Sequence, residues 1–309
     1  MSSTVLILTE DGDTQARHVA RALAGRGADT LVLDPGWFPG AARLSVALDP
    51  SGSARRMLLT DERRVDLDRL TSVWFRCPGP PLGDPADDGP VQQNGLASDV
   101  WDTLDCLAVP ASRAVIQRAQ RKLYQLSAAG RLGFELPSTL ISTDHDELLD
   151  FYLAHQGQIV TRVLNRPWAI TERAPQEQVP TLTDPKGTGP FPMVAQAQVL
   201  RRLALRVIVI GSRVFAAEIH SPKSVRRLRP HTLPDDVGLR CLNLMQALGL
   251  SFGTIDLTLT PEGRYVFLEV NPGGGFVLIE EITGMPVTEA ICDLLLTASS
   301  QEQAPPVQA

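Results

Sequence analysis

The residues best suited to chemistry lie near the C-terminal end of the chain. They are Asp256, Glu269 and Asn271, two carboxylates and one side-chain amide. Carboxylate and amide oxygens are hard ligands of the kind that Mg²⁺ prefers, and Mg²⁺ usually keeps several waters and binds together with nucleotide phosphates. The three residues therefore predict a metal site for chemistry on ATP, although acidic residues near strand ends also occur in proteins without such a site.

A predicted β-hairpin would position these ligands. Residues 251–259 alternate apolar and polar side chains, residues 260–263 are typical of a turn, and residues 264–270 are typical of a returning strand. Side chains alternate between the two faces of a strand, so Phe267, Glu269 and Asn271 are expected on one face. Asp256 on the partner strand can reach the same face.

Several segments resemble those of a known family. Residues 205–220, 267–272 and 281–291 are similar to the C-terminal part of the ATP-grasp ligases. More narrowly, they resemble the ATP-grasp peptide maturases that make graspetides, the microviridin-type macrocyclases. Residues 72–79 also resemble the strand and turn that close the first domain of this family. The resemblance covers nearly the whole chain in order.

The resemblance implies an ATP-grasp fold of the α/β class, with α+β character in the C-terminal part. It implies an N-terminal pre-ATP-grasp α/β domain at 1–108, a central domain at 109–195, and a C-terminal domain with the metal site at 196–299. ATP would lie between the last two domains. The polar tail at 300–309 contains two prolines and is expected to be disordered.

The local sequence patterns agree with this division. A strand, a helix and a second strand open the chain, which implies a parallel sheet with a right-handed crossover. The first turn lacks the glycine fingerprint of a dinucleotide site. The elements expected before the C-terminal domain are strands at 4–9, 30–34, 43–48, 54–60, 73–75, 137–141 and 158–164, helices at 13–26, 94–108, 112–130 and 144–155, and a lid or loop at 172–191.

The composition is that of a soluble globular protein. The 309 residues are 43% hydrophobic and 21% charged, and the formal net charge of −6 gives no electrostatic reason to expect nucleic acid or an anionic membrane as partner. The four cysteines are scattered, which favours reduced thiols over a zinc site. No apolar run resembles a signal peptide or a membrane span, so a cytoplasmic protein is expected.

The resemblance also implies which residues handle the nucleotide. Lys122 stands at the position of the family lysine that reaches the phosphates, and Arg162 stands where the family has a second lysine. Arg206 occupies the place of the phosphate-binding arginine, although a lone arginine on a strand is more often an edge residue in solvent. The implied nucleotide-binding residues are Lys122, Arg162, Gln196, Ala197, Val199 and Arg206, with backbone groups of Ala197 and Val199 bonding adenine.

The same resemblance implies the catalytic and metal residues. Arg206 and Glu269 would be catalytic, because charge that develops on a transferring phosphoryl group needs fixed cationic groups and metal. Asp256, Glu269 and Asn271 would hold Mg²⁺, expected as two ions.

The acceptor side of the site departs from the family pattern. Ala204 stands where relatives carry glutamate, and the Asp-Trp-Arg element of relatives is absent. The stretch 221–230 is basic instead, and it could contact an acidic peptide, replace the missing arginine, or be a solvated charge run. The glycines after Asn271 could let backbone approach a ligand. The candidate substrate residues are Arg226, Arg227, Arg229, Gly273 and Gly274.

The resemblance implies a Mg-ATP-dependent ligase that works through an acyl phosphate. It would join a side-chain carboxylate to an amine or hydroxyl within a ribosomally made precursor peptide that carries a leader, as a homodimer. Two alternatives stay open: a ligase of free amino acids or small carboxylates, and a non-catalytic relative that binds peptide. The intact set of Asp256, Glu269 and Asn271 argues against the second alternative.

Overall fold

The N-terminal part is built on a parallel three-stranded sheet. The computed structural model describes residues 3–38, 40–76, 99–163, 193–220 and 228–297. The strand order is β2-β1-β6, and both pairings are parallel. Asp13 caps the intervening helix α1 by accepting hydrogen bonds from the N–H groups of Gln15 and Ala16. The bounds are β1 Thr4–Leu8, α1 Thr14–Gly25, β2 Asp29–Leu33 and β6 Ser72–Phe75. The predicted β-α-β unit is confirmed.

A second, antiparallel sheet is inserted between β2 and β6. Its strand order is β3-β4-β5, and the predicted hairpin pair forms its first two strands. The inner face of this sheet joins the hydrophobic core of the N-terminal part through residues such as Leu58 and Val65. The bounds are β3 Ala42–Leu48, β4 Ala54–Thr60 and β5 Arg64–Asp66, with short 3-10 turns at η1 Pro35–Trp37 and η2 Leu67–Arg69.

Two helices lead toward the centre of the molecule, where the sequence predicts one or two. The stretch predicted as helical at 94–108 is helical over 99–103 in its described part and then turns as η3 Asp105–Leu107. Helix α3 Arg113–Ala119 is capped by the Ser112 side chain, and helix α4 Lys122–Arg131 follows after a break at residues 120 and 121.

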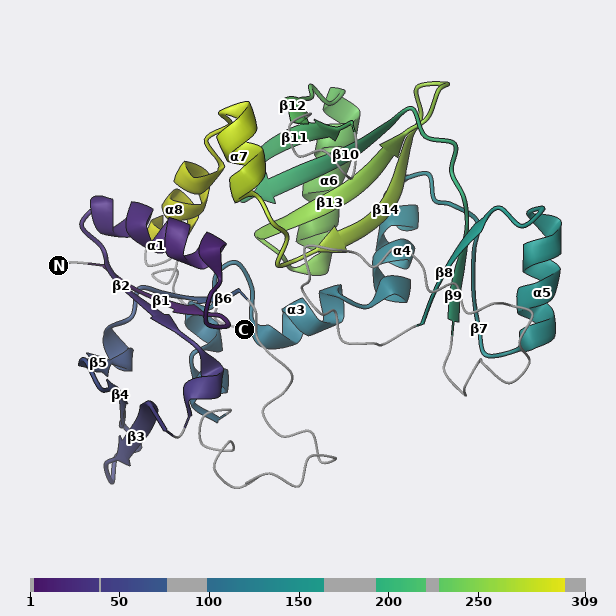
Figure 1. The fold of residues 1–309 in the computed structure, drawn as a ribbon. Coiled ribbons are helices and arrows are strands. Elements are labelled where there is room, and N and C mark those ends of the chain that lie inside the picture. Colours follow the sequence, from purple (N-terminus) through teal and green to yellow (C-terminus); the bar gives the residue numbers. More distant parts are fainter. Residues whose placement is uncertain (1–2, 39, 77–98, 164–192, 221–227, 298–309) are drawn as a thin grey trace, which may run out of the picture.

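A small antiparallel sheet with the order β7-β9-β8 lies at the right of Figure 1, with one helix packed on it. Its bounds are β7 Thr139–Ser142, α5 His145–Ala154, β8 Ile159–Val163 and β9 Met193–Ala197. The predicted domain boundary after residue 195 falls inside β9, and the domain limits stay a prediction. The predicted lid at 172–191 and the tail at 300–309 lie outside the described residues.

The C-terminal part contains a five-stranded antiparallel sheet with the order β12-β11-β10-β13-β14. Its β10 pairs with both β11 and β13, and β13 pairs with β14 as the predicted hairpin. The bounds are β10 Leu203–Ile210, β11 Arg213–Ile219, β12 Leu228–Pro230, β13 Phe252–Leu259 and β14 Tyr265–Asn271.

The two faces of this sheet have different partners. One face packs on helix α6 Asp235–Leu248, and its side chains share a core with α4 and the N-terminal part. The other face is covered at one end by helices α7 Val277–Thr283 and α8 Val287–Thr297, and α8 also packs against α1 (Figure 1). The rest of that second face carries the polar side chains of the site. Among the described residues, no helix is both long and apolar enough to span a membrane.

The prediction that Phe267 shares a face with Glu269 is wrong. The ladder pairs Asp256 with Glu269 but Leu257 with Phe267, so Leu268 is an extra residue in a β-bulge. The bulge shifts the alternation by one position, and Phe267 is fully buried in the core on the α6 side. Glu269 therefore lies on the opposite face, with Asp256.

Candidate active site

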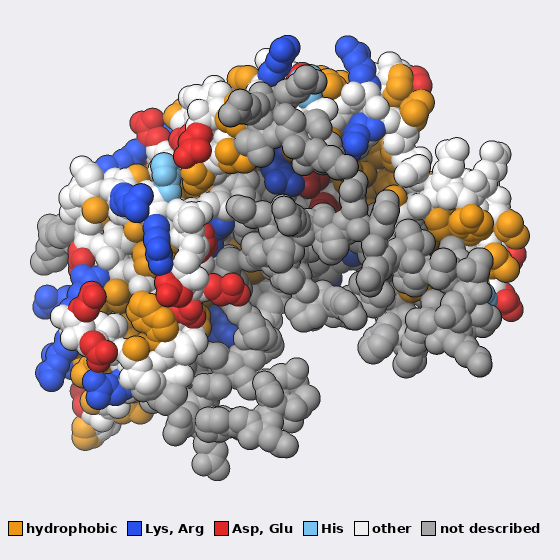
Figure 2. Space-filling view, in the orientation of Figure 1, with side chains coloured by type: hydrophobic (Ala, Val, Ile, Leu, Met, Phe, Trp, Pro, Cys, Tyr) orange, Lys and Arg blue, Asp and Glu red, His pale blue; other side chains and the backbone are white. Residues whose placement is uncertain are grey.

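Three predicted site residues form a row across the middle of the five-stranded sheet. Arg206 on β10 lies opposite Asp256 on β13, and Asp256 lies opposite Glu269 on β14. Directly opposed side chains on neighbouring strands lie on the same face at close range. The row therefore consists of one cation followed by two anions, and it lies on the face of the sheet that α6 does not cover. Figure 2 shows basic and acidic side chains close together near the upper middle of the view.

The first two members of the row form a forked ion pair. Nε of Arg206 donates to one carboxylate oxygen of Asp256 at 2.8 Å, and Nη2 donates to the other at 3.0 Å. The Asp256 charge, together with that of Glu269, raises the pKa of the Arg206 guanidinium. A guanidinium that is charged at every physiological pH and fits two oxygens at once is suited to a phosphate as well as to a carboxylate.

Lys122 reaches the far end of the same row. Its ammonium group donates to the carbonyl oxygen of Leu268 at 2.5 Å, and it lies 3.9 Å from the carboxylate of Glu269. The bulge at Leu268 thus turns a carbonyl outward to the first residue of α4. The lysine that the sequence assigns to phosphate binding and the glutamate that it assigns to metal binding are neighbours in the fold.

The donor set of the predicted metal site fits Mg²⁺ chemically. Asn271 lies two residues after Glu269 on β14 and opposite Thr254, so it is on the same face as the two carboxylates. Its side-chain oxygen accepts a hydrogen bond from the N–H of Gly273 at 2.9 Å. All donors are oxygens, as Mg²⁺ requires. Within the described part of the chain, no cluster of three or more His, Cys, Asp or Glu forms a separate metal site.

The predicted adenine-binding segment is partly strand. Gln196 is the next-to-last residue of β9, where its buried side chain donates to the hydroxyl of Thr139 at 3.0 Å. The N–H of Ala197 donates to the carbonyl of Ser138. Val199 lies in the segment that joins β9 to β10. Gln196 and Ala197 are therefore held in the small sheet of β7, β9 and β8. Val199 lies after them, in the segment that leads to β10 and Arg206.

The backbone of Arg162 is placed at the same small sheet. Arg162 lies on β8 in register with Val194 on β9. Both β8 and the segment around Val199 therefore border the same strand, β9. The role of Arg162 at the nucleotide stays a prediction.

The glycine run after Asn271 packs against the protein itself. A Cβ atom at Gly274 would lie 2.0 Å from the hydroxyl of Thr254, and one at Gly273 would lie 3.2 Å from the carbonyl oxygen of Arg76. Only glycine fits such approaches without a shift of neighbouring atoms. From the sequence, these glycines are attributed to the close approach of a ligand. The structure supplies an additional reason, which is their close packing against Thr254 and Arg76.

The candidate peptide-contacting arginines are only partly described. Arg226 and Arg227 lie outside the described residues. Arg229 is exposed on β12, in register with Glu218 on β11.

Two buried residues of this region were not singled out from the sequence. Arg76 is 5% exposed, donates to Asp13 at 2.8 Å and to the carbonyl oxygen of Gly273 at 3.3 Å, and so ties the N-terminal part to the loop after β14. Gln125 is 3% exposed and bonds to Val270 between the two β14 ligands. A helical spacing of three from Lys122 places Gln125 on the same side of α4, a signal that was present in the sequence.

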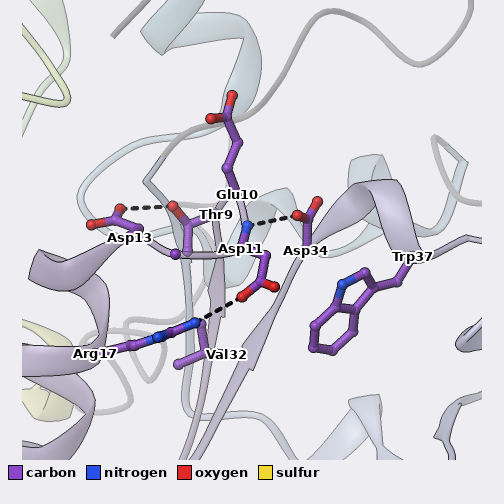
Figure 3. Close-up of a pocket in the computed structure, with 9 residues that line it drawn as sticks. Thr9, Glu10, Asp11, Asp13, Arg17, Val32, Asp34 and Trp37 are labelled. Atoms are coloured by element: carbon purple, nitrogen blue, oxygen red, sulfur yellow. Dashed lines mark hydrogen bonds and ion pairs between the residues drawn. The ribbon is translucent and has the colours of Figure 1, made fainter. Parts of the chain in front are cut away.

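A separate small hollow lies at the carboxyl end of the parallel sheet, away from the row on β10, β13 and β14. It has a volume of about 120 Å³, and two of its acidic side chains make local contacts: Asp34 accepts from the N–H of Asp11, and Asp11 pairs with Arg17 (Figure 3). These contacts shape the loop after β1, and none of them involves a predicted site residue.

Comparison with known proteins identifies the class. No family model matches the chain, and no curated protein sequence matches it. Solved structures match over almost its full length. The macrocyclase MdnB from Microcystis aeruginosa MRC is 31% identical, with a TM-score of 0.80 over 95% of this chain and 99% of that one. Fold and site together thus define an ATP-grasp ligase. The chain belongs to the family of RiPP-associated ATP-grasp ligases that includes the graspetide macrocyclases.

Two further structures share the fold. The macrocyclase MdnC from the same organism, bound with precursor peptide MdnA, is 26% identical, with a TM-score of 0.78 over 95% of this chain and 99% of that one. A RiPP-associated ATP-grasp ligase from Chryseobacterium gregarium, in complex with ADP and a leader and core peptide, is 21% identical, with a TM-score of 0.78 over 98% of each chain. The predicted fold class is confirmed.

Proposed function

We propose that the protein uses Mg-ATP to form side-chain ester or amide crosslinks in a ribosomally made precursor peptide. The observation that carries the proposal is the row of Arg206, Asp256 and Glu269, with Lys122 at its end. Two cations and two carboxylates are close together in it. That combination suits a triphosphate and its metal, because each needs charges of the opposite sign held in fixed positions.

The chain's own residues would divide the work as follows. Lys122 and Arg206 would leave their carboxylate partners and bind phosphate oxygens. Asp256, Glu269 and Asn271 would hold the metal, which when bound neutralises phosphate charge and orients the attack. Arg162 would add a further cation at the nucleotide. The segment from Gln196 through Ala197 to Val199 would border adenine.

The reaction itself has two displacements. An oxygen of a substrate carboxylate forms a bond to the γ-phosphorus as the bond to the ADP oxygen breaks, which gives an acyl phosphate. An amine or hydroxyl of the peptide then attacks the acyl carbon, phosphate leaves, and the nucleophile's proton is released. Each crosslink therefore removes one water from the peptide in total. Arg206 would stabilise the charge on the transferring phosphoryl group.

The substrate side rests on the relatives. MdnC and the Chryseobacterium gregarium ligase were solved with precursor, leader or core peptides. For this chain we propose a precursor peptide whose leader is acidic, contacted by Arg226, Arg227 and Arg229. The loop with Gly273 and Gly274, which lies directly after the metal ligands, would face the core segment.

A titration tests the whole proposal. The full-length protein is incubated with Mg-ATP and a precursor candidate, and ADP release is measured against peptide concentration. Peptide-dependent ADP release that Glu269→Gln abolishes supports the proposal. ADP release with free amino acids but not with peptide would favour a ligase of small carboxylates, and peptide binding without ADP release would favour a non-catalytic peptide-binding protein.

A triple variant tests the peptide contact. Replacing Arg226, Arg227 and Arg229 by serine should weaken peptide binding and its salt dependence while sparing ATP affinity. Lost ATP binding with intact peptide binding would instead assign these arginines to the phosphates.

A further inference from the structure

The strand β14 carries two of the proposed metal ligands, Glu269 and Asn271, and its outer edge is held by side chains of helix α4. β14 is the last strand of the five-stranded sheet, so every second residue directs its N–H and C=O away from β13. Val270 is such a residue, it lies between Glu269 and Asn271, and it is 4% exposed. Buried backbone groups without partners are costly, so these two groups need hydrogen bonds from outside the sheet.

The side chain of Gln125 supplies both of these bonds. Its amide oxygen accepts from the N–H of Val270 at 3.0 Å, and its amide nitrogen donates to the carbonyl oxygen of Val270 at 2.7 Å. The second proton of the nitrogen goes to the carbonyl oxygen of Ala119 at 2.7 Å, at the end of α3. Gln125 thus bonds to Val270 as a neighbouring strand would.

The orientation of the Gln125 amide is dictated by its partners. The N–H of Val270 can only donate, and the carbonyl oxygens of Val270 and Ala119 can only accept. Turning the amide over would place donor against donor and acceptor against acceptor at all three contacts. A single arrangement satisfies the group, and at 3% exposure water cannot substitute for a lost bond.

The same helix carries the phosphate-binding candidate. Lys122 lies three residues before Gln125 on α4 and donates to Leu268, two residues before Val270. Helix α4 therefore holds the edge of β14 at two points, one on each side of Glu269. The position of the lysine and the positions of the metal ligands are set by one helix.

We propose that Gln125 is a positioning residue for the metal site, one that fixes Glu269 and Asn271 relative to Lys122 by bonding both backbone groups of Val270. This inference rests on the proposed function. Groups that orient metal ligands without touching the metal typically change metal affinity by about 10- to 100-fold when removed.

Manganese binding tests the role directly, because Mn²⁺ takes the same oxygen ligands and is detected by electron paramagnetic resonance. Mn²⁺ is titrated into the full-length protein with a non-hydrolysable ATP analogue. Gln125→Met keeps the approximate shape and removes all three bonds. We expect its dissociation constant for Mn²⁺ to rise by about 10-fold or more. Tyr124→Phe is the matched control, because Tyr124 lies on the same helix as Gln125 but donates its hydroxyl hydrogen bond to the carbonyl oxygen of Ala247 on α6.

The dissociation constant separates positioning from general stability. A merely structural role would lower the folded fraction but leave the affinity of the folded molecules unchanged. A folded Gln125→Met protein that binds Mn²⁺ within twofold of wild type would overturn the inference. If that variant does not fold, Gln125→Glu, which still accepts from Val270, is measured under the same criterion.

A measurement on the unaltered protein covers the case in which neither variant folds. With selective ¹⁵N-glutamine labelling, the side-chain amide signal of Gln125 should shift when metal is added to the nucleotide complex. An unshifted signal would overturn the inference. Failure of the proposed function would give a different result. The wild-type protein and Glu269→Gln would then bind Mn²⁺ equally in the presence of the nucleotide.

Discussion

Arg206 and Asp256 are joined by two hydrogen bonds, so the cation predicted for phosphate and a carboxylate predicted for metal neutralise each other in the structure. Binding of Mg-ATP would separate this pair, because Arg206 would bind phosphate oxygens and Asp256 would bind the metal ion. The ion pair therefore holds both side chains at the site and competes with each ligand when that ligand binds alone.

Removal of the Arg206 cation should affect nucleotide and metal in opposite directions. In Arg206→Ala, ATP affinity and turnover should fall, because a phosphate contact is lost. Mn²⁺ binding without nucleotide should become tighter, because Asp256 is released from its partner. Calorimetric titrations with each ligand measure both effects. Arg213→Ala, which removes an arginine paired with Asp293 on the surface, is the control. Unchanged affinity for both ligands would contradict this account of the pair.

The charge of Glu269 should be essential for turnover. Glu269→Gln keeps the shape of the side chain and removes the negative charge, so ADP release should fall by about 100-fold or more. Circular dichroism should show that the fold is retained. Glu262→Gln, in the turn of the same hairpin, should leave turnover unchanged. Near-wild-type ADP release from a folded Glu269→Gln protein would refute the metal assignment.

Lys122 and Arg162 should respond differently to substitution. Lys122→Ala removes an ammonium group beside Glu269, so the Michaelis constant for ATP should rise. Arg131→Ala at the other end of α4 is its control. Arg162→Lys retains a cation and restores the usual family residue, so it should be tolerated. If Arg162→Lys abolished activity and Lys122→Ala had no effect, the nucleotide would lie elsewhere.

The stability of the C-terminal sheet should depend on pH through Glu218. Hydrogen bonds from His231 and His220 hold the pKa of this carboxyl below its ordinary value of 4.5. A depressed pKa means that the contribution to stability is present above about pH 4.5 and is lost as the pH falls through the folded-state pKa. Glu218→Gln should therefore lower the melting temperature at pH 7, and the difference from wild type should shrink in acid. A difference that grows on acidification would contradict the assignment, and Glu281→Gln on α7 serves as the exposed control.

The sequence predicted the elements of the site better than their contacts. The hairpin of β13 and β14 and the helical position of Lys122 followed from apolar periodicity. The bulge at Leu268 did not, because β14 is nearly continuous in apolar residues and an extra residue leaves no break in the pattern. Phe267 was assigned to the wrong face for this reason.

Contacts between segments that are distant in the sequence could not be predicted from local sequence patterns either. The pairing of Arg206 with Asp256 depends on the register of β10 against β13, which joins residues 50 positions apart. The close approach of Gly273 to Arg76 joins the N-terminal part to the end of β14. Periodicity reports which face a side chain occupies, and it contains no information about the partner on that face.

The mass of a precursor peptide tests the central claim most directly. A candidate precursor is co-expressed with the full-length protein, and its intact mass is compared with that of peptide co-expressed with Glu269→Gln. The account predicts the loss of one or more whole water molecules with the wild-type protein and an unchanged mass with the variant. An unchanged peptide mass with a folded wild-type protein that binds the peptide and consumes ATP in its presence would contradict it.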